Sequence, residues 1–516
     1  MNYFSPDNKN NPNGDWVRSK IDSELSNDLF FQDFSRHSIE KRGSSFSKRK
    51  RIILVDVLKD QYSEWGENKD LLSRIDQLLN PKSVTVTCGH QLCVGLGPLY
   101  VHSKIRETQY LAELLSEKYN RPVVPIFWMA TEDHDFEEIR HWEFKNKIFS
   151  IEENIKGVAV GAISSAIVTE VLQRMKLELG TNASINDLLD QFYRAYNKEG
   201  TLSDATRRLV YDFHPEVICI DASDSRLKKM ASKLWEDEIM NQTLYESRDT
   251  SLWEKSKRDV PVPFKKSMMF YLIDGNRSRI DFENGKYVTN KKSWEPQELV
   301  DELKSNPERV SPNALLRPIY QEYIIPNIAY LGGAGEIEYW LELIPYLKNY
   351  MKSEVRIKIR TSFAWWTRTV ERKWGQISKK GLDYWTTEKT FRLSLLNSLG
   401  ISDVNTFPLH EEILPLMRNL YGNKKGIQRS VESWLQRIKK DEERMNERVR
   451  RNALREESID YERFKLFREE QHPKNILQER VWTILDLTYY FGSDSCLQYS
   501  ECLKNESNGF LWILPD

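Results

Sequence analysis

Apolar and polar positions in the first half of the chain predict a parallel sheet. Residues 83–88 form a β-branched run that ends at Gly89, and residues 122–130 form a second apolar run, as buried strands do. Between them, residues 99–119 repeat apolar side chains at helical spacing. A strand, a glycine-containing loop, a helix and a strand in this order indicate a βαβ unit with a right-handed crossover.

Later segments predict a second step of the same kind. Residues 202–213 have a helical pattern and lead into a short apolar strand at 216–221, and residues 317–347 are expected to return to the sheet. Residues 141–160 switch to a period of two, and residues 251–287 have the pattern of loops and hairpins. The predicted fold class is therefore α/β, with a parallel core and inserted segments.

The last third of the chain has a different pattern of charged and apolar residues. Residues 431–470 contain 11 acidic and 11 basic residues, no Gly and no Pro, which predicts one long, solvated helix with a narrow buried seam. Its antiparallel partner is expected within residues 388–420, interrupted at Gly400, Pro408 and Pro415. The two would form a coiled-coil arm; the alternative is an ordinary surface helix.

These patterns predict three parts. Residues 1–385 would form the core with its insertions, after a flexible stretch at the first fifteen residues. Residues 386–470 would form the helical arm. Residues 471–516 contain an apolar tail, which is expected to pack back on the core.

Composition narrows the function classes. The 516 residues are 40% hydrophobic and 30% charged, as in a globular protein. Lys and Arg total 76 against 77 Asp and Glu, so the net charge creates no overall positive potential that would attract nucleic acid. No apolar run is long enough to cross a membrane. Five cysteines without a CxxC motif and the absence of a signal segment predict a soluble, cytoplasmic protein with reduced thiols.

The first candidate site is the loop between the first strand and the helix that follows it. Backbone N–H groups at a helix N-terminus favour an anion, glycines allow a ligand to approach closely, and Lys104 could add charge. The alternative is a tight turn with a core-facing His. The candidate residues of this loop are Gly89, His90, Gln91, Gly97 and Tyr100.

The second candidate follows the second strand and is strongly acidic. In an open parallel sheet, ligands bind at the carboxyl ends of the strands. Clustered acids suit acid–base chemistry or cation binding, and His134 and Glu138 would share a helix face. Helix capping by Thr131 or Asp133 is the alternative. The candidate catalytic residues are Glu132, Asp133, His134 and Asp135.

The third candidate combines an arginine with a second glycine loop. Arg317 can hold a carboxylate or phosphate bidentately, with Gln321 one helical turn away. The loop would offer another anion site before a helix, unless it is only a structural turn. Its residues are Gly332, Gly333, Gly335 and Glu336. Near the C-terminus, Arg480 could reach the same site or only pin the tail.

Taken in order, these segments resemble the BshC family of bacillithiol biosynthesis. The motifs that carry the resemblance are Gly89, Gln91 and Gly97–Tyr100, Pro125–Trp128, Glu132–Phe136, Arg317-Pro318 with Gln321, Gly332–Glu336 with Tyr339-Trp340, and Leu477–Arg480. The resemblance implies a Rossmann-like core with connecting insertions and a coiled-coil domain that makes homodimers. His90 stands where the family often has Gln, and residues 93–96 also depart from its pattern.

The resemblance also implies a reaction, in which a ligase joins L-cysteine to glucosaminyl malate through an amide bond. A free carboxylate is a poor acyl donor, so ATP or another nucleoside triphosphate is a plausible co-substrate. The first loop and Lys104 would then hold an anionic group, Arg317 a malate carboxylate, and one acid of the second cluster would deprotonate the attacking amine.

Two other functions fit parts of the pattern. One is a metal-dependent hydrolase or transferase built on His90, Asp133, His134 and Asp135. The other is a non-catalytic nucleotide-binding scaffold. Basic residues and tryptophans at 356–368 could mark a nucleic-acid site, but the neutral net charge argues against one. The ligase hypothesis requires Gln91, Asp133 and Gly333 to face one cavity.

Overall fold

A computed structural model gives the architecture of most of the chain. It describes residues 2–4, 34–65, 68–145, 147–179, 182–198, 200–249, 254, 259–273, 275–353, 355–377, 384–399, 409–421, 425–456, 458–493 and 510–514. The chain divides into two compact units. The core unit comprises Tyr3–Phe363 and Glu479–Leu511, and the arm unit comprises Ala364–Gln478 and Trp512–Asp516. The first fifteen residues, predicted to be flexible, lie almost entirely outside the described part.

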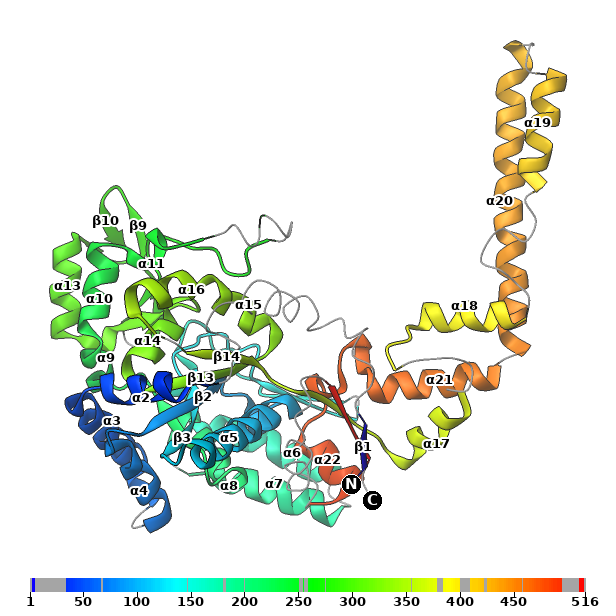
Figure 1. Cartoon of the computed structure of the whole chain (residues 1–516). Coiled ribbons are helices and arrows are strands. Elements are labelled where there is room, and N and C mark those ends of the chain that lie inside the picture. The colour runs from blue at the N-terminus through cyan, green and yellow to red at the C-terminus, as the bar shows by residue number, and fades with distance from the viewer. Residues whose placement is uncertain are drawn as a thin grey trace. The chain divides into compact units, whose positions relative to one another are not determined.

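The core unit is built on five parallel strands (Figure 1). Their order across the sheet is β14 (Arg356–Ile359), β13 (Asn327–Gly332), β2 (Val84–His90), β3 (Val123–Met129) and β6 (Ile218–Asp221). Every residue of β3 is buried, which explains its continuous apolar run. The predicted parallel α/β core is confirmed.

The connecting helices cover the sheet as the sequence pattern predicts. α5 (Leu99–Tyr119) packs on β2 and β3, and α8 (Leu202–Phe213) leads into β6. α15 (Ala334–Glu342) packs on β13 and β14. Near the N-terminus, α2 (Arg36–Ser45) contacts β2 and β13, and α3 (Lys48–Gln61) contacts β6.

The strand order creates a crevice at one place. From β2 the chain moves outward through β3 to β6, and then returns to the other side of β2 for β13 and β14. The order therefore reverses between β2 and β13. Because all five strands are parallel, their carboxyl ends share one edge, and the reversal leaves a binding crevice there.

Two insertions extend this core. The first carries the predicted antiparallel hairpin, β4 (His141–Phe144) and β5 (Lys147–Ser150), and then α6 (Thr169–Leu179) and α7 (Ala183–Tyr196). The second carries α9 (Ser225–Met230), α10 (Ser232–Met240), α11 (Thr243–Glu246), β7 (Met269–Ile273), β8 (Asn276–Arg279), β9 (Asp281–Glu283), β10 (Lys286–Val288), β11 (Ser293–Trp294), α13 (Pro296–Ser305), β12 (Val310–Pro312) and α14 (Leu316–Ile324).

Several short elements complete the core unit. They are α4 (Lys69–Asp76), α16 (Ile344–Tyr346) and α22 (Ile484–Phe491), with β1 (Asn2–Phe4), β15 (Ser362–Trp365) and β16 (Phe510–Leu514) beginning or ending near the unit boundaries. α22 packs against α7, and its Ile484 and Leu485 join the hydrophobic core. No described helix is long and apolar enough to cross a membrane. Cys88, Cys93 and Cys219 are free thiols, whereas Cys496 and Cys502 lie outside the described residues.

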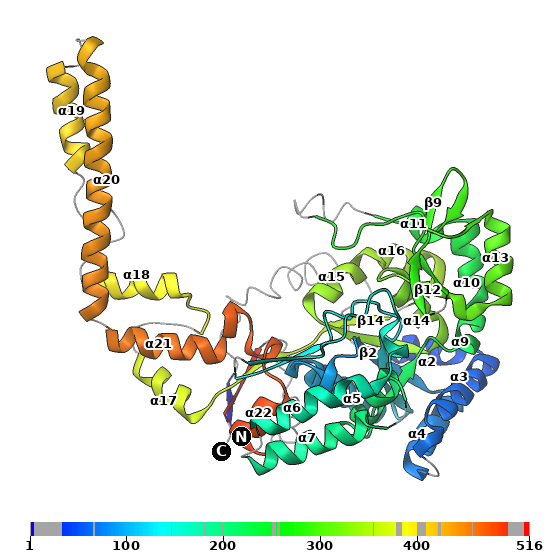
Figure 2. The ribbon, with the colours of Figure 1, turned by 180° about the vertical axis from the view of Figure 1, so that it is seen from behind.

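The arm unit is helical. It contains α17 (Arg368–Ile377), α18 (Glu388–Ser398), α19 (Leu409–Tyr421), α20 (Lys425–Glu456) and α21 (Ser458–Gln471). α19 and α18 both pack on α20, and Figure 2 shows α19 running alongside it. The partner of the charged helix thus lies in the predicted region.

Two details of the arm correct the sequence prediction. Residues 431–470 belong to two helices, α20 and α21, instead of one. The two helices differ in their surroundings: α21 buries Phe464 and Phe467 among aromatic rings, whereas α20 remains largely exposed. Pro415 lies inside α19 instead of ending it. Pro415 is exposed, so the carbonyl that its missing N–H leaves free can be hydrated. Gly400 and Pro408 lie outside the described residues.

Candidate active site

A cavity of about 660 Å³ opens at the carboxyl edge of the sheet, within the core unit. Gln91, Asp133 and Gly333 all line it, although they come from three separate segments. The other predicted residues on its wall are Gly89, His90, Tyr100, Lys104, Glu132, Arg317, Gly335, Glu336 and Arg480. The crevice at the strand-order reversal is therefore a real pocket.

The first glycine loop places His90 beside the cavity as a neutral group. A Cβ atom at Gly89 would lie 3.3 Å from the Trp128 Cβ and from the Tyr330 hydroxyl, so a side chain there would crowd the neighbouring strands. The His90 Nε2 atom lies 2.9 Å from the Tyr100 hydroxyl. Burial, with the nearby Lys104 charge, lowers the pKa of His90 to about 3. His90 is therefore uncharged at neutral pH and cannot neutralise a phosphate.

Glu336, in the first turn of α15, is the charged centre of the second glycine loop. Its carboxylate lies 2.9 Å from Lys104 Nζ and 3.6 Å from the Arg317 guanidinium, and it accepts a hydrogen bond from the Tyr330 hydroxyl. Burial alone would raise the pKa of Glu336, but the Lys104 and Arg317 charges outweigh it and lower that pKa. Lys104 and Arg317 thus already have an anionic partner within the protein.

The acidic segment folds as a turn and not as the expected helix. The Asp133 carboxylate accepts hydrogen bonds from the backbone N–H groups of His134 and Asp135, and its other oxygen accepts one from the Gln91 amide at 2.8 Å. A helix face shared by His134 and Glu138 therefore does not exist, because side chain and loop contacts satisfy the backbone instead.

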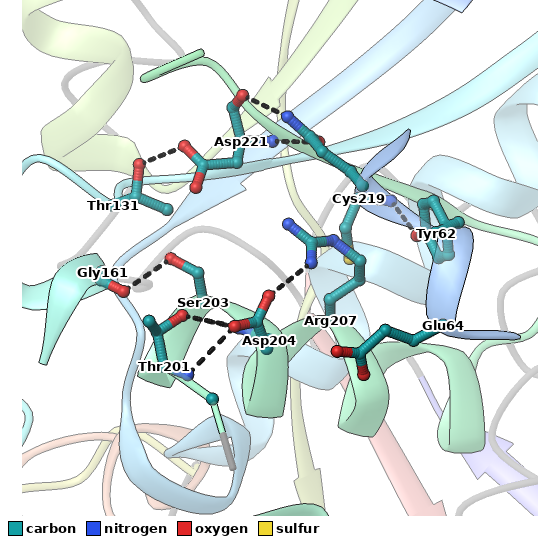
Figure 3. A network of polar contacts seen from close by, with 12 residues as sticks. Tyr62, Glu64, Thr131, Gly161, Thr201, Ser203, Asp204, Arg207, Cys219 and Asp221 are labelled. Carbon is teal, nitrogen blue, oxygen red and sulfur yellow. Dashed lines mark hydrogen bonds and ion pairs between the residues drawn. The ribbon is translucent and has the colours of Figure 1, made fainter. Parts of the chain in front are cut away.

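Contacts with β6 and α8 hold the acidic turn in place. Figure 3 shows the Thr131 hydroxyl directed at the Asp221 carboxylate, 2.6 Å away, and the Ser203 hydroxyl directed at the Gly161 carbonyl. The Gly161 N–H donates to the Thr131 carbonyl at 2.7 Å. A Cβ atom at Gly161 would lie only 2.5 Å from the Thr131 Cβ atom. Only glycine allows this close approach.

The two acids on the cavity wall differ in their surroundings. Glu132 forms an ion pair with Lys228, whose ammonium group is fully buried and also donates to the carbonyls of Glu308 and Val310. Within the described part of the chain, Asp133 accepts hydrogen bonds from the Gln91 amide at Oδ2 and from backbone N–H groups at Oδ1, and His134 Nδ1 lies 3.7 Å away. The Asp133 carboxylate is therefore less strongly paired within the protein than the Glu132 carboxylate is.

The C-terminal turn brings Arg480 to the cavity. Its neighbour Glu479 is fully buried and accepts hydrogen bonds from both terminal nitrogens of Arg360, at 2.6 and 2.9 Å. The guanidinium groups of Arg360 and Arg480 lie 4.8 and 6.0 Å from the centre of the Tyr100 ring. Arg480, more than a hundred residues after the last strand of the sheet, thus forms part of the cavity wall.

Five predicted site residues do not line the cavity. Gly97 has a φ of +68° and packs on Cys93, and Gly332 lies beneath Ile337. Gln321 is buried, where it accepts a hydrogen bond from Arg317. His134 and Asp135 are exposed beyond the rim.

The chain matches known proteins along most of its length. Residues 18–358 match the family described as "Bacillithiol biosynthesis BshC, N-terminal Rossmann-like domain", and residues 409–514 match its "C-terminal coiled-coil domain". The chain belongs to the BshC family. The resemblance inferred from the ordered motifs is confirmed, and so is the combination of a Rossmann-like core with a coiled-coil domain.

Individual BshC proteins extend this similarity. The chain is 32% identical to a protein of Flavobacterium johnsoniae over 87% of its own length and 86% of the relative's. It is 35% identical to one of Christiangramia forsetii, over 68% and 66%, and 24% identical to one of Staphylococcus epidermidis, over 92% of both chains. Each of these relatives carries the name "Putative cysteine ligase BshC".

The BshC cavity also contains residues that the sequence analysis missed. The sequence pattern marks Arg360 only as part of a basic, tryptophan-containing patch, and it gives Arg277, Asn313 and Ser223 no role. Arg277 and Asn313 belong to the second insertion, Ser223 lies two residues after β6, and no motif marks these three. The one sequence signal is that Ser223 lies two residues after a predicted strand that ends in an acid.

The hypothesis of a metal site finds no support in the assembled geometry. Among the residues that the structure describes, no group of three or more His, Cys, Asp and Glu side chains could hold a metal ion. His90 contacts Tyr100, whereas His134 contacts Arg277, and neither His134 nor Asp135 lines the cavity. These side chains do not converge.

Proposed function

We propose that this BshC chain is a ligase that joins the carboxyl group of L-cysteine to the amine of glucosaminyl malate. One observation supports it most directly: the acidic turn, both glycine loops and Arg480 converge on one cavity at the point where the strand order reverses. Both reactants carry a carboxylate and an amine, which cationic and acidic wall residues can bind. The names of the BshC relatives agree with this assignment.

In the proposed reaction, the sugar amine attacks the activated cysteine carbonyl. The new C–N bond forms, the activating group leaves with its electron pair, and the amine loses one proton. Asp133 would accept this proton, because Glu132 is held by the buried Lys228 and His134 lies outside the cavity wall. Gln91, which donates to Asp133 Oδ2, would keep the carboxylate oriented toward the amine.

Activation of the carboxyl group would come from ATP or another nucleoside triphosphate. The residues that would hold its phosphates are Gly333 and Gly335, at the start of α15, where backbone N–H groups and the helix dipole favour an anion. A Cβ atom at either glycine would meet no atom within 4 Å, so there is open space in front of the helix. The local residues therefore fit a phosphate group.

We further propose that the protein acts as a cytoplasmic homodimer formed through its arm. α19 and α20 leave large apolar side chains exposed, which a second copy could cover: Leu416 and Leu420 are 63% and 64% exposed, and Trp434 and Met445 are 40% and 55% exposed. Light scattering should give twice the mass of the chain, and Leu416→Asp together with Leu420→Asp should give a monomer. A monomeric wild type would contradict this proposal.

The activity is tested with purified protein. L-cysteine, glucosaminyl malate and a panel of nucleoside triphosphates should give the cysteinyl amide, detected by mass spectrometry. Asp133→Asn should lower kcat about 10²-fold or more, because the general base is lost. Asp135→Asn is the matched control, since this neighbouring carboxylate is exposed outside the cavity, and it should leave kcat within about twofold.

A second test uses the cell. In an organism that makes bacillithiol, deletion of the gene should abolish the thiol and cause glucosaminyl malate to accumulate. Unchanged bacillithiol, or product formed equally well by Asp133→Asn, would contradict the proposed function or the proposed base, respectively.

A further inference from the structure

The cations of the cavity differ in whether the protein neutralises them. Lys104 and Arg317 share the Glu336 carboxylate, and Arg360 is held bidentately by Glu479. Two cations on the wall, Arg277 and Arg480, have no carboxylate within 4.0 Å among the residues that the structure describes. Arg277 and Arg480 would therefore contribute most to the binding of an anion.

Arg277 has an unusual set of partners. On β8, its Nε atom donates to the Ser311 hydroxyl at 3.1 Å, and one terminal nitrogen donates to the Pro312 carbonyl at 2.7 Å. The other terminal nitrogen donates to His134 Nδ1 at 3.1 Å, and the guanidinium stacks on the Phe270 ring at 3.9 Å. All these partners are neutral, so they fix the position of the charge without cancelling it.

The contact between Arg277 and His134 also determines the hydrogen-bonding role of the His134 ring. A guanidinium can only donate hydrogen bonds, so His134 Nδ1 must accept and cannot carry a proton in this arrangement. His134 is then a neutral support for Arg277. Glu132 and Asp133 lie near enough to influence the Arg277 charge, but Glu132 is paired with Lys228 and Asp133 with Gln91 and backbone N–H groups.

We propose that Arg277 determines specificity by binding a carboxylate of the malate portion of the sugar substrate. The proposal rests on the proposed function. Three of the five N–H groups of Arg277 are used by Ser311, Pro312 and His134, which leaves two for a carboxylate from the cavity. Arg317, expected from the sequence to hold this carboxylate, is instead occupied by Glu336, Tyr330 and Tyr339.

The test measures binding to the full-length protein by calorimetry, without cysteine or nucleotide. The probes are glucosaminyl malate and methyl glucosaminide, which has the same sugar but no carboxylate. Wild-type protein should prefer the malate compound, and Arg277→Gln should weaken its binding about 10- to 100-fold through the loss of a charge-assisted hydrogen-bonded pair. Arg277→Lys keeps the charge but loses the planar fork, and should lie between the two.

A matched control lies on the same strand. Arg279 is half-exposed and paired with Asp281 at 3.0 Å, so Arg279→Gln should bind glucosaminyl malate as the wild type does. If wild type and Arg277→Gln bind the malate compound equally, the role of Arg277 is wrong while the proposed function stands. If wild-type protein does not distinguish the malate compound from methyl glucosaminide, both the inference and the proposed substrate are wrong.

Discussion

Glu336 shows how a single residue controls the charge of the cavity. Its carboxylate is the shared partner of Lys104 and Arg317, and the three groups lie largely out of water. Glu336→Gln would leave two buried cations without an anion, which should lower the free energy of unfolding by about 3 kcal/mol. Urea unfolding measures this change.

The matched control for Glu336 is Glu117, an exposed residue on α5. Glu117→Gln should change the free energy of unfolding by no more than about 0.5 kcal/mol. If both variants were equally stable, the Glu336 carboxylate would not be the group that offsets the burial of Lys104 and Arg317.

Gly161 tests the support beneath the acidic turn. A methyl group at this position would overlap the Thr131 Cβ and carbonyl, at 2.5 and 2.8 Å, and the Ser203 hydroxyl at 2.6 Å. Gly161→Ala should therefore cost about 1–3 kcal/mol of stability and shift Glu132 and Asp133, with a loss of kcat. Gly375→Ala is the control, because a Cβ atom there meets nothing within 4 Å. Equal thermal stability of the two variants would contradict this explanation.

At the scale of elements, α5 and the end of α8 are joined by two buried histidines. His102 Nδ1 lies 3.2 Å from His214 Nε2. Burial lowers the pKa of His102 to about 4 and that of His214 well below its usual value. Below pH 6.5 the unfolded chain binds protons that the folded chain does not, so stability should fall as the pH is lowered from about 6.5 to 4, by up to about 1.4 kcal/mol per pH unit for each histidine.

Unfolding by urea at several pH values checks this pH dependence. His102→Gln should make the loss of stability between pH 6.5 and 4 smaller than in the wild type. His141→Gln, at an exposed position on β4, should leave it unchanged. A wild-type slope in His102→Gln would show that the pair does not titrate as its burial indicates.

The elements themselves were the most predictable part of the molecule. α5 and α8 begin and end at the predicted residues, because their periodicity and flanking residues all favour the same boundaries. The carboxyl-edge rule placed Gln91, Asp133 and Gly333 on one cavity. By contrast, Arg277 could not be predicted, since its role depends on which cations have carboxylate partners, and this is decided by contacts between distant segments.

At the scale of the whole molecule, the chain leaves the core unit after Phe363 and re-enters it at Glu479. Both points are tied to one buried ion pair. Arg360 and Glu479 are 3% and 0% exposed at their side chains, and the Phe363 N–H also donates to the Glu479 carboxylate at 3.0 Å. The segment Ala364–Gln478 is thus an excursion from the core unit, and the two core-unit residues that flank it are joined by a hydrogen bond beside the cavity.

This arrangement predicts that Glu479 stabilises the core unit and positions the site at once. Glu479→Gln should lower the free energy of unfolding by about 3–5 kcal/mol, because the buried Arg360 loses its anion, and should lower kcat because Arg360 and Arg480 both lie against Tyr100. Glu216→Gln breaks the exposed pair with Arg74 and should cost at most about 1 kcal/mol with normal kcat. If Glu479→Gln behaved like Glu216→Gln in both urea unfolding and turnover, the ends of the arm would have no influence on the cavity, and Arg480 would reach it for reasons unrelated to this ion pair.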